Sequence, residues 1–329
     1  MNTVKIAFSD FWGDFNPKDN FIIDALKKNF KVELSDNPDF VFCSNFGNKH
    51  LKYHCVKIYF TGENLCPDFN LVDYAMGFQP IEFCDRFLRF PLYVLYNEAC
   101  KLAIHKHEQK DPNINSRKFC NFVISNSISD PARDEMIALL NSYKRVDSGG
   151  KYMNNVGGPV PDKIEFEKGY KFTMCFENSS SKGYTTEKIM EAFAGCTVPI
   201  YWGNPDIANE FNPRAFINCH DFDSFDDVLE EVKRLDNDNE AFLAMLREPI
   251  LTEKSEANSY LSPDYVSDYL YSIISQGPEK AYRRNRIYIG ERYENQAAFH
   301  QKIDNILYYP RRTLFYLKNR LRIAGKKSK

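Results

Sequence analysis

The sequence predicts an α/β protein made of two halves, each with a parallel sheet. Short apolar runs alternate with helical patterns along the whole chain, which is typical of parallel α/β architecture. A polar segment at residues 111–117, DPNINSR, has the composition of a linker. A second series of apolar and helical patterns then restarts at residue 118.

The first half shows its elements in order. VKIAFSDF at residues 4–11 predicts a strand, and the apolar spacing over residues 19–30 predicts a helix capped by Asp19 or Asn20. VKIYF, which runs directly into TGEN, predicts another strand, and an extended piece followed by a helix is expected over residues 87–110. The remaining predicted strands of this half are KVELS at 31–35 and DFVFCSNF at 39–46.

The second half repeats the alternation. Asp130 and Pro131 predict the start of a helix over ARDEMIALLNSY, because Asp favours the cap and Pro the first helical position. A second helix, TTEKIMEAFAG, is expected to end at Gly195. A third, SFDDVLEEVKRL, has a start that resembles a capping box. The predicted strands are KFCNFVISN at 118–126, YKFTMCFEN at 170–178, TVPIYWG at 197–203 and AFINCHDF at 215–222.

Composition narrows the class of protein. The 329 residues are 43% hydrophobic and 27% charged, which is ordinary for a soluble globular protein and excludes disordered, collagen-like and disulfide-scaffold chains. The start, MNTVKIAF, predicts a strand rather than a signal peptide, and no apolar stretch approaches the roughly 18 residues that span a bilayer. Nine cysteines without CxxC spacing favour a reducing cytoplasm and no zinc site.

Ligands of open parallel sheets bind at the carboxyl ends of strands, so the polar residues that directly follow predicted strands are the candidate site residues. The loop after residue 177, ENSSSKGYTTEK, offers backbone N–H groups and a helix N-terminus to an anion. Lys188 lies in the first turn of that helix, where a cation opposes the helix dipole unless an anionic ligand compensates. Arg133 repeats this placement, so a shared diphosphate ligand fits both. The alternatives are a solvent-exposed Lys188 and an Arg133 paired with Asp134 or Glu135.

Further polar residues follow the same logic. Glu63 ends an apolar strand, where a partly desolvated carboxylate is suited to act as a general base; the alternative is an ordinary turn residue. We call residues 177–188 the anion loop. Asn178 and Tyr184 lie in this loop and have groups that can bind a ligand, although a Tyr in a chain with 15% aromatic residues is more often a packing residue. No convincing DxD carboxylate pair supports a metal-dependent sugar-nucleotide transferase.

Long motifs carry a resemblance to a known family. The stretch FTMCFENSSSKGYTTEKIMEAFAGCTVPIYWGNPDIANEFNPRAFIN resembles the donor-binding motif of bacterial, Helicobacter-type alpha-1,3-fucosyltransferases. YFTGENLCPDFNLVDYAMGF with RFLRFPLY is similar to their acceptor-side region, and FVISNSISDPARDEMIALLNSY to the segment with their donor-binding arginine. The seven-residue repeats of the Helicobacter-type members are not visible here.

The resemblance implies a GT-B fold, in which two Rossmann-like domains face each other across a cleft. It also implies an inverting, metal-independent transfer of fucose from GDP-fucose, with no cofactor required. The general base would be Glu63, and the diphosphate-binding cations would be Arg133 and Lys188. The donor-loop residues would be Asn178, Tyr184 and Glu187, of which Glu187 would also stabilise oxocarbenium-like charge near the fucose.

The resemblance and the patterns together predict an organisation and a set of partners. We expect an acceptor-side domain at 1–110, a GDP-fucose domain at 111–270, and C-terminal helices at 271–329 that pack back on the body and end in a basic amphipathic tail. The acceptor would be a lactosamine-type or lactose-type glycan, fucosylated at the 3-OH of N-acetylglucosamine or glucose to give Lewis-type glycans. The open alternatives are a GT-B transferase with another nucleotide sugar and an inactive sugar-nucleotide-binding, membrane-associated protein.

The C-terminal residues 310–329 differ from the rest of the chain. They carry eight Lys or Arg and no acidic residue, so within a total net charge of −2 the remaining chain carries −10. Their apolar residues are compatible with an amphipathic helix that binds an anionic membrane surface, which predicts a cytoplasmic protein on the inner face of the membrane. The alternatives are a solvated terminus and a nucleic-acid-binding arm, and we expect no nucleic-acid partner.

Overall fold

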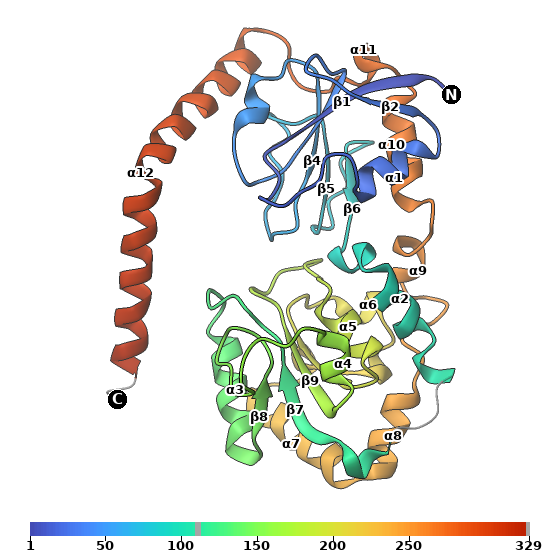
Figure 1. Ribbon diagram of the computed structural model, residues 1–329, viewed down its shortest axis with the longest axis vertical. Helices are drawn as coiled ribbons and strands as arrows, with labels where there is room; N and C mark the ends of the chain where they lie inside the picture. Colours follow the sequence, from blue (N-terminus) through green and yellow to red (C-terminus); the bar gives the residue numbers. More distant parts are fainter. Residues whose placement is uncertain (109–112, 327–329) are drawn as a thin grey trace. The chain divides into compact units, whose positions relative to one another are not determined.

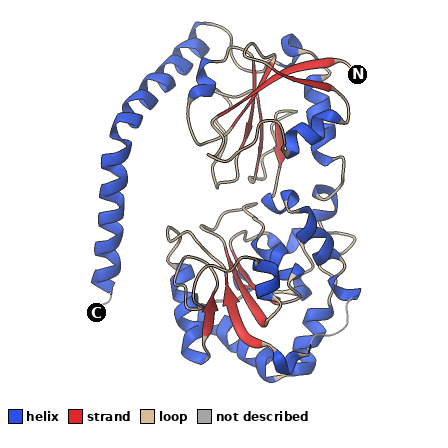
Figure 2. Cartoon of the chain, viewed as in Figure 1, coloured by secondary structure: helices blue, strands red, loops and turns tan. Residues whose placement is uncertain are grey.

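Two parallel β-sheets flanked by helices form the computed structural model (Figures 1 and 2). The first sheet has six strands in the order β2-β1-β3-β4-β5-β6, and the second has five in the order β11-β10-β9-β7-β8. The structure describes residues 1–108 and 113–326, so the predicted linker at 111–117 lies partly outside the described residues. The predicted α/β class with two parallel sheets is confirmed.

The first sheet and its neighbours come from both ends of the chain. The cap of α1 is Asn20, whose Oδ1 accepts hydrogen bonds from the backbone N–H groups of Ile22 and Ile23 at 3.1 Å each, as predicted. The strands are β1 (Thr3–Ser9), β2 (Lys31–Leu34), β3 (Phe40–Cys43), β4 (Val56–Phe60), β5 (Tyr74–Gly77) and β6 (Phe87–Arg89). The helices are α1 (Phe21–Lys27), α10 (Tyr265–Ile274), α11 (Pro278–Ala281) and α12 (Tyr288–Lys326).

The second sheet has helices on both faces. Its strands are β7 (Lys118–Phe122), β8 (Val146–Ser148), β9 (Tyr170–Phe176), β10 (Val198–Trp202) and β11 (Ile217–Asn218). The helices are α2 (Asn97–Ile104), α3 (Ala132–Tyr143), α4 (Lys163–Glu167), α5 (Lys188–Ala194), α6 (Ile207–Glu210), α7 (Phe225–Asn237), α8 (Asn239–Arg247) and α9 (Ala257–Tyr260).

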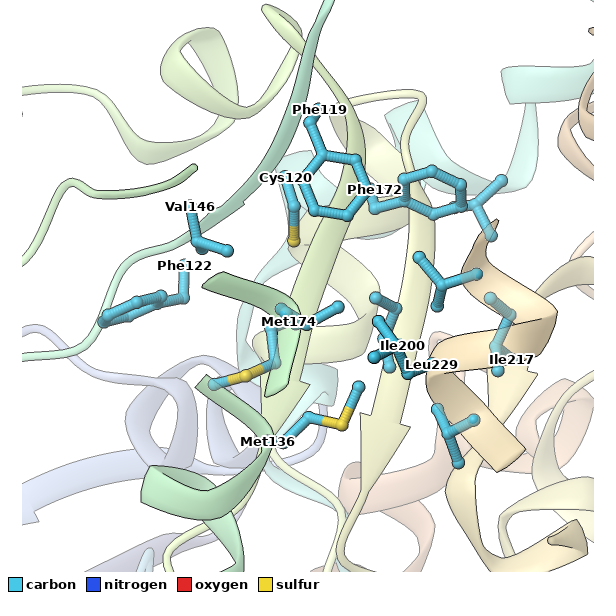
Figure 3. Packing of buried hydrophobic residues seen from close by; sticks show 14 of the residues in the cluster. Phe119, Cys120, Phe122, Met136, Val146, Phe172, Met174, Ile200, Ile217 and Leu229 are labelled. Atoms are coloured by element: carbon cyan, nitrogen blue, oxygen red, sulfur yellow. The ribbon is translucent and has the colours of Figure 1, made fainter. Parts of the chain in front are cut away.

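All seven residues of β9 are buried, because apolar clusters cover both faces of the second sheet. Phe172, Met174 and Phe176 point to one face, where they pack with residues of α3, α7 and α8 (Figure 3). Cys175 points to the other face, where α2 and α5 cover it. This alternation follows from the two-residue period of a strand, and burial on both faces explains why the run reads as continuously apolar.

One predicted helix is shorter than expected. The pattern TTEKIMEAFAG predicts a start at residue 185, but α5 begins at Lys188. The hydroxyl groups of Thr185 and Thr186 donate to the buried carboxylates of Glu210 and Glu177 at 2.7 Å each, and these bonds hold both residues in an extended loop. Gly195 is the C-cap of α5, as predicted.

The chain divides into two compact units. The first contains residues 1–60, 67–75 and 270–329, and the second contains residues 61–66 and 76–269. These units follow spatial contacts, whereas the sequence analysis divides the chain at 110 and 270. Residues 76–110 therefore belong to the second unit, and residues 270–329 to the first.

A buried ion-pair network holds the segment before α12 to the first sheet. Asp73 accepts hydrogen bonds from the backbone N–H groups of Lys57, Arg283 and Arg284 at 2.8, 2.8 and 2.9 Å. It also pairs with the Arg284 guanidinium at 3.0 Å, and both side chains are almost completely buried. The Arg284 guanidinium also pairs with Glu294 of α12.

The predicted basic tail belongs to α12, which the structure describes as helical up to Lys326. Leu314 and Leu317 are 57% and 51% exposed, while residues 327–329 lie outside the described part of the chain. Over the residues that the structure describes, none of the helices combines the length and apolar character needed to cross a membrane.

Candidate active site

The strand order of the second sheet marks where a ligand can bind. β7 lies between β8 and β9. The connection after β7 leads to β8 on one side of it, and the connection after β9 leads to β10 on the opposite side. Loops that leave a parallel sheet in opposite directions open a crevice at the carboxyl ends of the strands. Here the two loops are residues 123–131, after β7, and residues 177–187, after β9.

Arg133 connects these two loops from the first turn of α3. Its Nη1 donates to the Asn126 carbonyl at 3.1 Å. Its Nη2 donates to the carbonyls of Phe176 and Glu177 at 3.3 and 3.2 Å, and to Oδ1 of Asn178 at 2.7 Å. The Arg133 side chain is fully buried, and its Nε has no hydrogen-bond partner among the described residues.

The Arg133 guanidinium therefore donates its hydrogen bonds to neutral carbonyl and amide oxygens and not to a carboxylate. Burial lowers the pKa of the guanidinium, and the nearby Glu177 raises it. The alternative for Arg133, an exposed side chain paired with Asp134 or Glu135, is not found: the side chain is fully buried, and no ion pair of Arg133 occurs in the described residues. The cation contributes positive potential to both loops, although its side chain is fully buried.

Lys188 is the first residue of α5, and its ammonium group is nearly buried. Nζ lies 3.0 Å from Glu177, 2.9 Å from Oγ1 of Thr186 and 3.7 Å from Glu187. Burial opposes the charge of Lys188, but Glu177 and Glu187 outweigh burial and raise its pKa. The solvent-exposed alternative for Lys188 is wrong, because its side chain is only 14% exposed.

Glu177 organises this end of the loop, and the sequence analysis assigned it no role. Its carboxylate is fully buried and accepts hydrogen bonds from the Thr186 N–H at 2.8 Å and from the Lys188 ammonium at 3.0 Å. The only signal in the sequence is its position directly after the buried strand β9. A buried carboxylate needs such donors, so Glu177 fixes both Thr186 and Lys188.

Glu187 is the N-cap residue of α5 and remains an anion. Burial raises its pKa, but Lys188 and Lys163 outweigh burial, so the net pKa lies below the ordinary value of a Glu. Its side chain is 18% exposed. A charged carboxylate at this position can stabilise positive charge that develops on a bound sugar.

Glu63 belongs to the same compact unit, in the loop 61–66 that follows β4. Its backbone N–H and carbonyl both bond to the Thr61 hydroxyl, at 3.0 and 3.1 Å. The next residue, Asn64, anchors this loop to the anion loop: its Nδ2 donates to Ser179 at 2.8 Å, and its Oδ1 accepts from Ser181 at 3.0 Å.

The Glu63 carboxyl has the character expected of a general base. Although the residue is exposed, partial loss of water around the carboxyl raises its pKa; Lys188 lowers it, and Glu187 raises it further. The hydrogen bonds of Asn64 to Ser179 and Ser181 bring the Glu63 loop to the anion loop, and Lys188 and Glu187 affect the pKa of Glu63. Its carboxylate has no hydrogen bond within the described residues, and a base in this state is available to take a proton.

Tyr184 is buried, with only 2% of its surface exposed. Its ring packs edge-on against Phe78, with ring centroids 4.8 Å apart, and burial raises the pKa of its hydroxyl group. Asn178 is only partly buried and bonds to Arg133. The structure therefore gives Tyr184 a packing role and gives Asn178 a link to the buried cation.

A clamp that the sequence analysis missed holds the middle of the anion loop. Asn204 Oδ1 accepts from the Gly183 N–H at 2.8 Å, and Arg89 donates to the Gly183 carbonyl at 3.3 Å. Glu210 accepts from Arg89, Thr185 and Asn204 at 2.5, 2.7 and 2.7 Å. No local pattern predicts this, because the residues are far apart in sequence.

Gly183 itself must be a glycine. Its φ of +82° is rarely adopted by other residues, and a Cβ there would come within 2.2 Å of the Phe78 carbonyl oxygen. The backbone of Gly183 thus lies directly against the Phe78 carbonyl, and both its N–H and its carbonyl group are hydrogen-bonded. The clamp fixes the path of the chain toward Glu187 and Lys188.

Two parallel α/β sheets, with cations and carboxylates gathered where the strand order of the second sheet reverses, define a protein of the nucleotide-binding α/β class. Comparison with known families is more specific. Residues 6–96 match the alpha-(1,3)-fucosyltransferase FucT N-terminal domain, and residues 114–247 match the glycosyltransferase family 10 (fucosyltransferase) C-terminal domain. The chain belongs to glycosyltransferase family 10, the fucosyltransferases.

Individual relatives agree with this assignment. The chain is 37% identical to the alpha-(1,3)-fucosyltransferase FucT of Helicobacter pylori over 78% of its own length and 62% of that protein. It thus spans less than two thirds of that relative. A crystal structure of an alpha1,3-fucosyltransferase with GDP-fucose superposes with a TM-score of 0.71 at 33% identity, covering 82% of this chain and 90% of that one. A putative fucosyltransferase of Acanthamoeba polyphaga mimivirus is 30% identical over 48% of this chain and 26% of its own.

Proposed function

We propose that this protein transfers fucose from GDP-fucose to the 3-OH of N-acetylglucosamine or glucose in lactosamine-type or lactose-type acceptors. The transfer would invert the configuration, require no metal and build Lewis-type glycans. The observation that carries the proposal is the convergence of Glu63, Glu187 and Lys188 in one compact unit. The similarity to an alpha1,3-fucosyltransferase that binds GDP-fucose supports the choice of donor.

Each residue has a role that suits its environment. Glu63 takes the proton of the attacking hydroxyl, because its carboxylate is unpaired in the described residues and has a raised pKa. Glu187 stays charged and stabilises the positive charge that develops on the sugar ring. A single displacement from the side opposite the nucleotide then converts a beta-linked donor into an alpha-linked product.

The departing GDP requires positive charge. Lys188 and Arg133 lie in the first turns of the helices that follow the two loops of the switch point, and they would supply this charge in place of a divalent cation. Lys188 would contact the diphosphate once its bonds to Glu177 and Glu187 rearrange. Arg133 would act through its potential, Asn178 would line the donor site, and Tyr184 would support the anion loop from its buried position against Phe78.

Linkage analysis of the product tests the proposal. The full chain is incubated with GDP-fucose and a panel of N-acetyllactosamine, lactose and the type 1 isomer of lactosamine. We expect GDP release and a new alpha-1,3-linked fucose. Activity only with UDP-sugars or GDP-mannose would support another donor, and no turnover with any donor would support an inactive binding protein.

The basic tail would hold the protein on the inner face of the cytoplasmic membrane. We expect deletion of residues 310–329 to raise solubility and to abolish sedimentation with vesicles rich in phosphatidylglycerol, because eight cationic side chains are lost. Turnover on a soluble acceptor should stay within about twofold of the full chain. Loss of that turnover would show that the tail serves the catalytic unit instead.

A further inference from the structure

A group of aromatic rings lies at the carboxyl ends of β1 and β3 in the first unit. We call Trp12 and Phe46 the aromatic platform; their ring centroids are 6.4 Å apart and their planes are at 76°. Trp12 packs on Phe11 and Phe15, with centroids 5.6 and 5.1 Å away. Phe46 is 53% exposed and Trp12 is half-buried, so both rings present surface to solvent.

The two loops that carry the platform are tied to each other. The Phe46 N–H donates to the Asp10 carbonyl at 3.0 Å. The Asp10 carboxylate accepts from the N–H groups of Lys49 and His50 at 2.9 and 2.7 Å. A Cβ at Gly47 would lie 2.3 Å from Oδ1 of Asp10, so the Asp10 side chain packs directly against the backbone of Gly47. The rings are therefore held in a fixed geometry, which lowers the entropy lost on binding.

The platform lies at the point where the strand order of the first sheet reverses. β1 is flanked by β2 and β3, so the loops after β1 and β3 leave the sheet in opposite directions. In the second sheet the equivalent loops, after β7 and β9, carry Arg133 and the anion loop. The platform thus lies at the position where open α/β sheets bind ligands.

The charges at the two positions differ. Residues 9–16 and 44–48, which form the platform loops, contain Asp10 and Asp14 but no Lys or Arg; the next cations along the chain are Lys18 after the first loop and Lys49 after the second. An anionic nucleotide would meet no compensating charge from these loops. A neutral, hydroxylated ligand fits better, because its C–H groups can pack on the negative faces of the rings while its hydroxyl groups reach polar atoms at the edge.

We propose that the aromatic platform binds a hexopyranose unit of the neutral acceptor glycan, with the Phe46 ring packing against the C–H face of the sugar and the Trp12 ring, at 76° to it, contacting the edge of the sugar. This inference rests on the proposed function for the identity of the ligand. Phe60 belongs to the same aromatic group, with its ring stacked on Phe11 at 6.5 Å.

Fluorine NMR of the intact chain offers a direct test of binding. The sequence has two tryptophans, Trp12 and Trp202, so labelling with 5-fluorotryptophan gives two signals. Trp202 lies in β10 of the other unit, stacked on Phe176. W202F, or W12F if W202F does not fold, assigns the signals. Titration with N-acetyllactosamine should shift only the Trp12 signal, in a saturable way.

Variants of Phe46 then test the stacking. F46A should weaken N-acetyllactosamine binding about tenfold, the effect of losing one ring contact of roughly 1.4 kcal/mol. F46L retains apolar bulk and should weaken binding nearly as much, because it lacks a ring face. F299A is the matched control, since Phe299 is also exposed, at 61%, but lies on α12. It should bind like the parent chain.

Kinetics separate this inference from the proposed function. F46A should raise the KM for the acceptor about tenfold, with the KM for GDP-fucose and the hydrolysis of GDP-fucose without acceptor unchanged. A shift of the Trp12 signal by GDP that F46A abolishes would overturn the proposal in favour of a nucleobase site. No saturable shift with any saccharide would also overturn it. A saccharide response without fucose transfer would refute only the proposed function.

Discussion

Glu63 and Glu187 carry opposite pKa shifts although both interact with Lys188. Loss of water dominates at Glu63 and raises its pKa. At Glu187, Lys188 and Lys163 together outweigh burial and lower the pKa. Two neighbouring carboxylates with pKa values moved apart can take different tasks, one as a proton acceptor and one as a permanent anion.

We expect E63Q to lower kcat by about 10²- to 10⁴-fold, because the amide cannot accept the proton. The KM for GDP-fucose should change little, since the donor cations are untouched. In the parent chain, kcat/KM should fall as the pH drops through the raised pKa of Glu63. Steady-state rates from pH 4.5 to 8 give both quantities, and an unchanged acid limb in E63Q would assign the base elsewhere.

Glu167 is a second buried carboxyl group of interest, and neither of its oxygens has a hydrogen-bond partner among the described residues. Burial raises its pKa to about 8, although Lys163 nearby lowers it. Because the folded pKa exceeds the ordinary value, the protonated form favours folding. That stabilisation is complete below the ordinary pKa and is lost as the pH rises toward 8.

We therefore expect the parent chain to lose about 2–4 kcal/mol of stability relative to E167Q between pH 5 and pH 8.5. The matched control is E165Q, in which an exposed carboxylate of the same helix is neutralised. Differential scanning calorimetry at both pH values measures the difference. Parallel changes in the parent and E167Q would mean that Glu167 is ionised throughout.

At the scale of elements, residues outside the anion loop fix its conformation. Asn204, Arg89 and Glu210 do this through hydrogen bonds to and around Gly183 and Thr185. Glu210 of α6 receives four hydrogen bonds, from Arg89, Thr185, Asn204 and Tyr93. Its carboxylate is almost completely buried. One residue of α6 thereby holds β6 and the loop before α5 in place.

E210Q should cost about 3–5 kcal/mol of stability, because an amide cannot satisfy these donors and leaves Arg89 incompletely paired. It should also raise the KM for GDP-fucose more than it lowers kcat, since the loop positions Lys188. E256Q is the control, because Glu256 binds the same Arg89 but is 48% exposed. Urea unfolding and isothermal titration with GDP measure the two effects; equal behaviour of both variants would argue against the clamp.

At the scale of the whole molecule, the chain returns to its first sheet before it ends. Arg284 lies more than 200 residues after Asp73, yet the two form a nearly completely buried pair. Glu294 adds a contact between α12 and both Arg284 and Lys57. The first unit therefore needs the C-terminal segment to complete its ion pairs.

D73N should destabilise the first unit by about 3–5 kcal/mol, since it removes the buried carboxylate of the pair and leaves the buried Arg284 guanidinium with Glu294, which is partly exposed, as its one remaining carboxylate in the described residues. E279Q, which removes an exposed pair with Arg286, should change stability by less than about 1 kcal/mol. Hydrogen exchange should show faster exchange at residues 283–294 in D73N alone. Normal protection of that segment would mean that other contacts hold it.

The sequence by itself determined the local elements and named the candidate residues of the site. The alternating patterns located both sheets, Asn20 and Gly195 marked helix ends, and the motif around residues 177–188 led to the family. These features depend on neighbours within a few residues, so periodicity and capping rules reach them. The late start of α5 was missed, because distant carboxylates hold Thr185 and Thr186.

Only the tertiary structure decided how the site residues are held and charged. It buried Arg133 without a carboxylate, paired Lys188 with Glu177, and placed Glu210 and Arg89 behind Gly183. It also brought Trp12 and Phe46 together where the strand order reverses. Such contacts join residues far apart in the chain, and the pKa of a group depends on burial and on charges that neighbouring elements bring. A sequence pattern can therefore identify the candidate side chains, but their burial and their neighbouring charges depend on the tertiary structure.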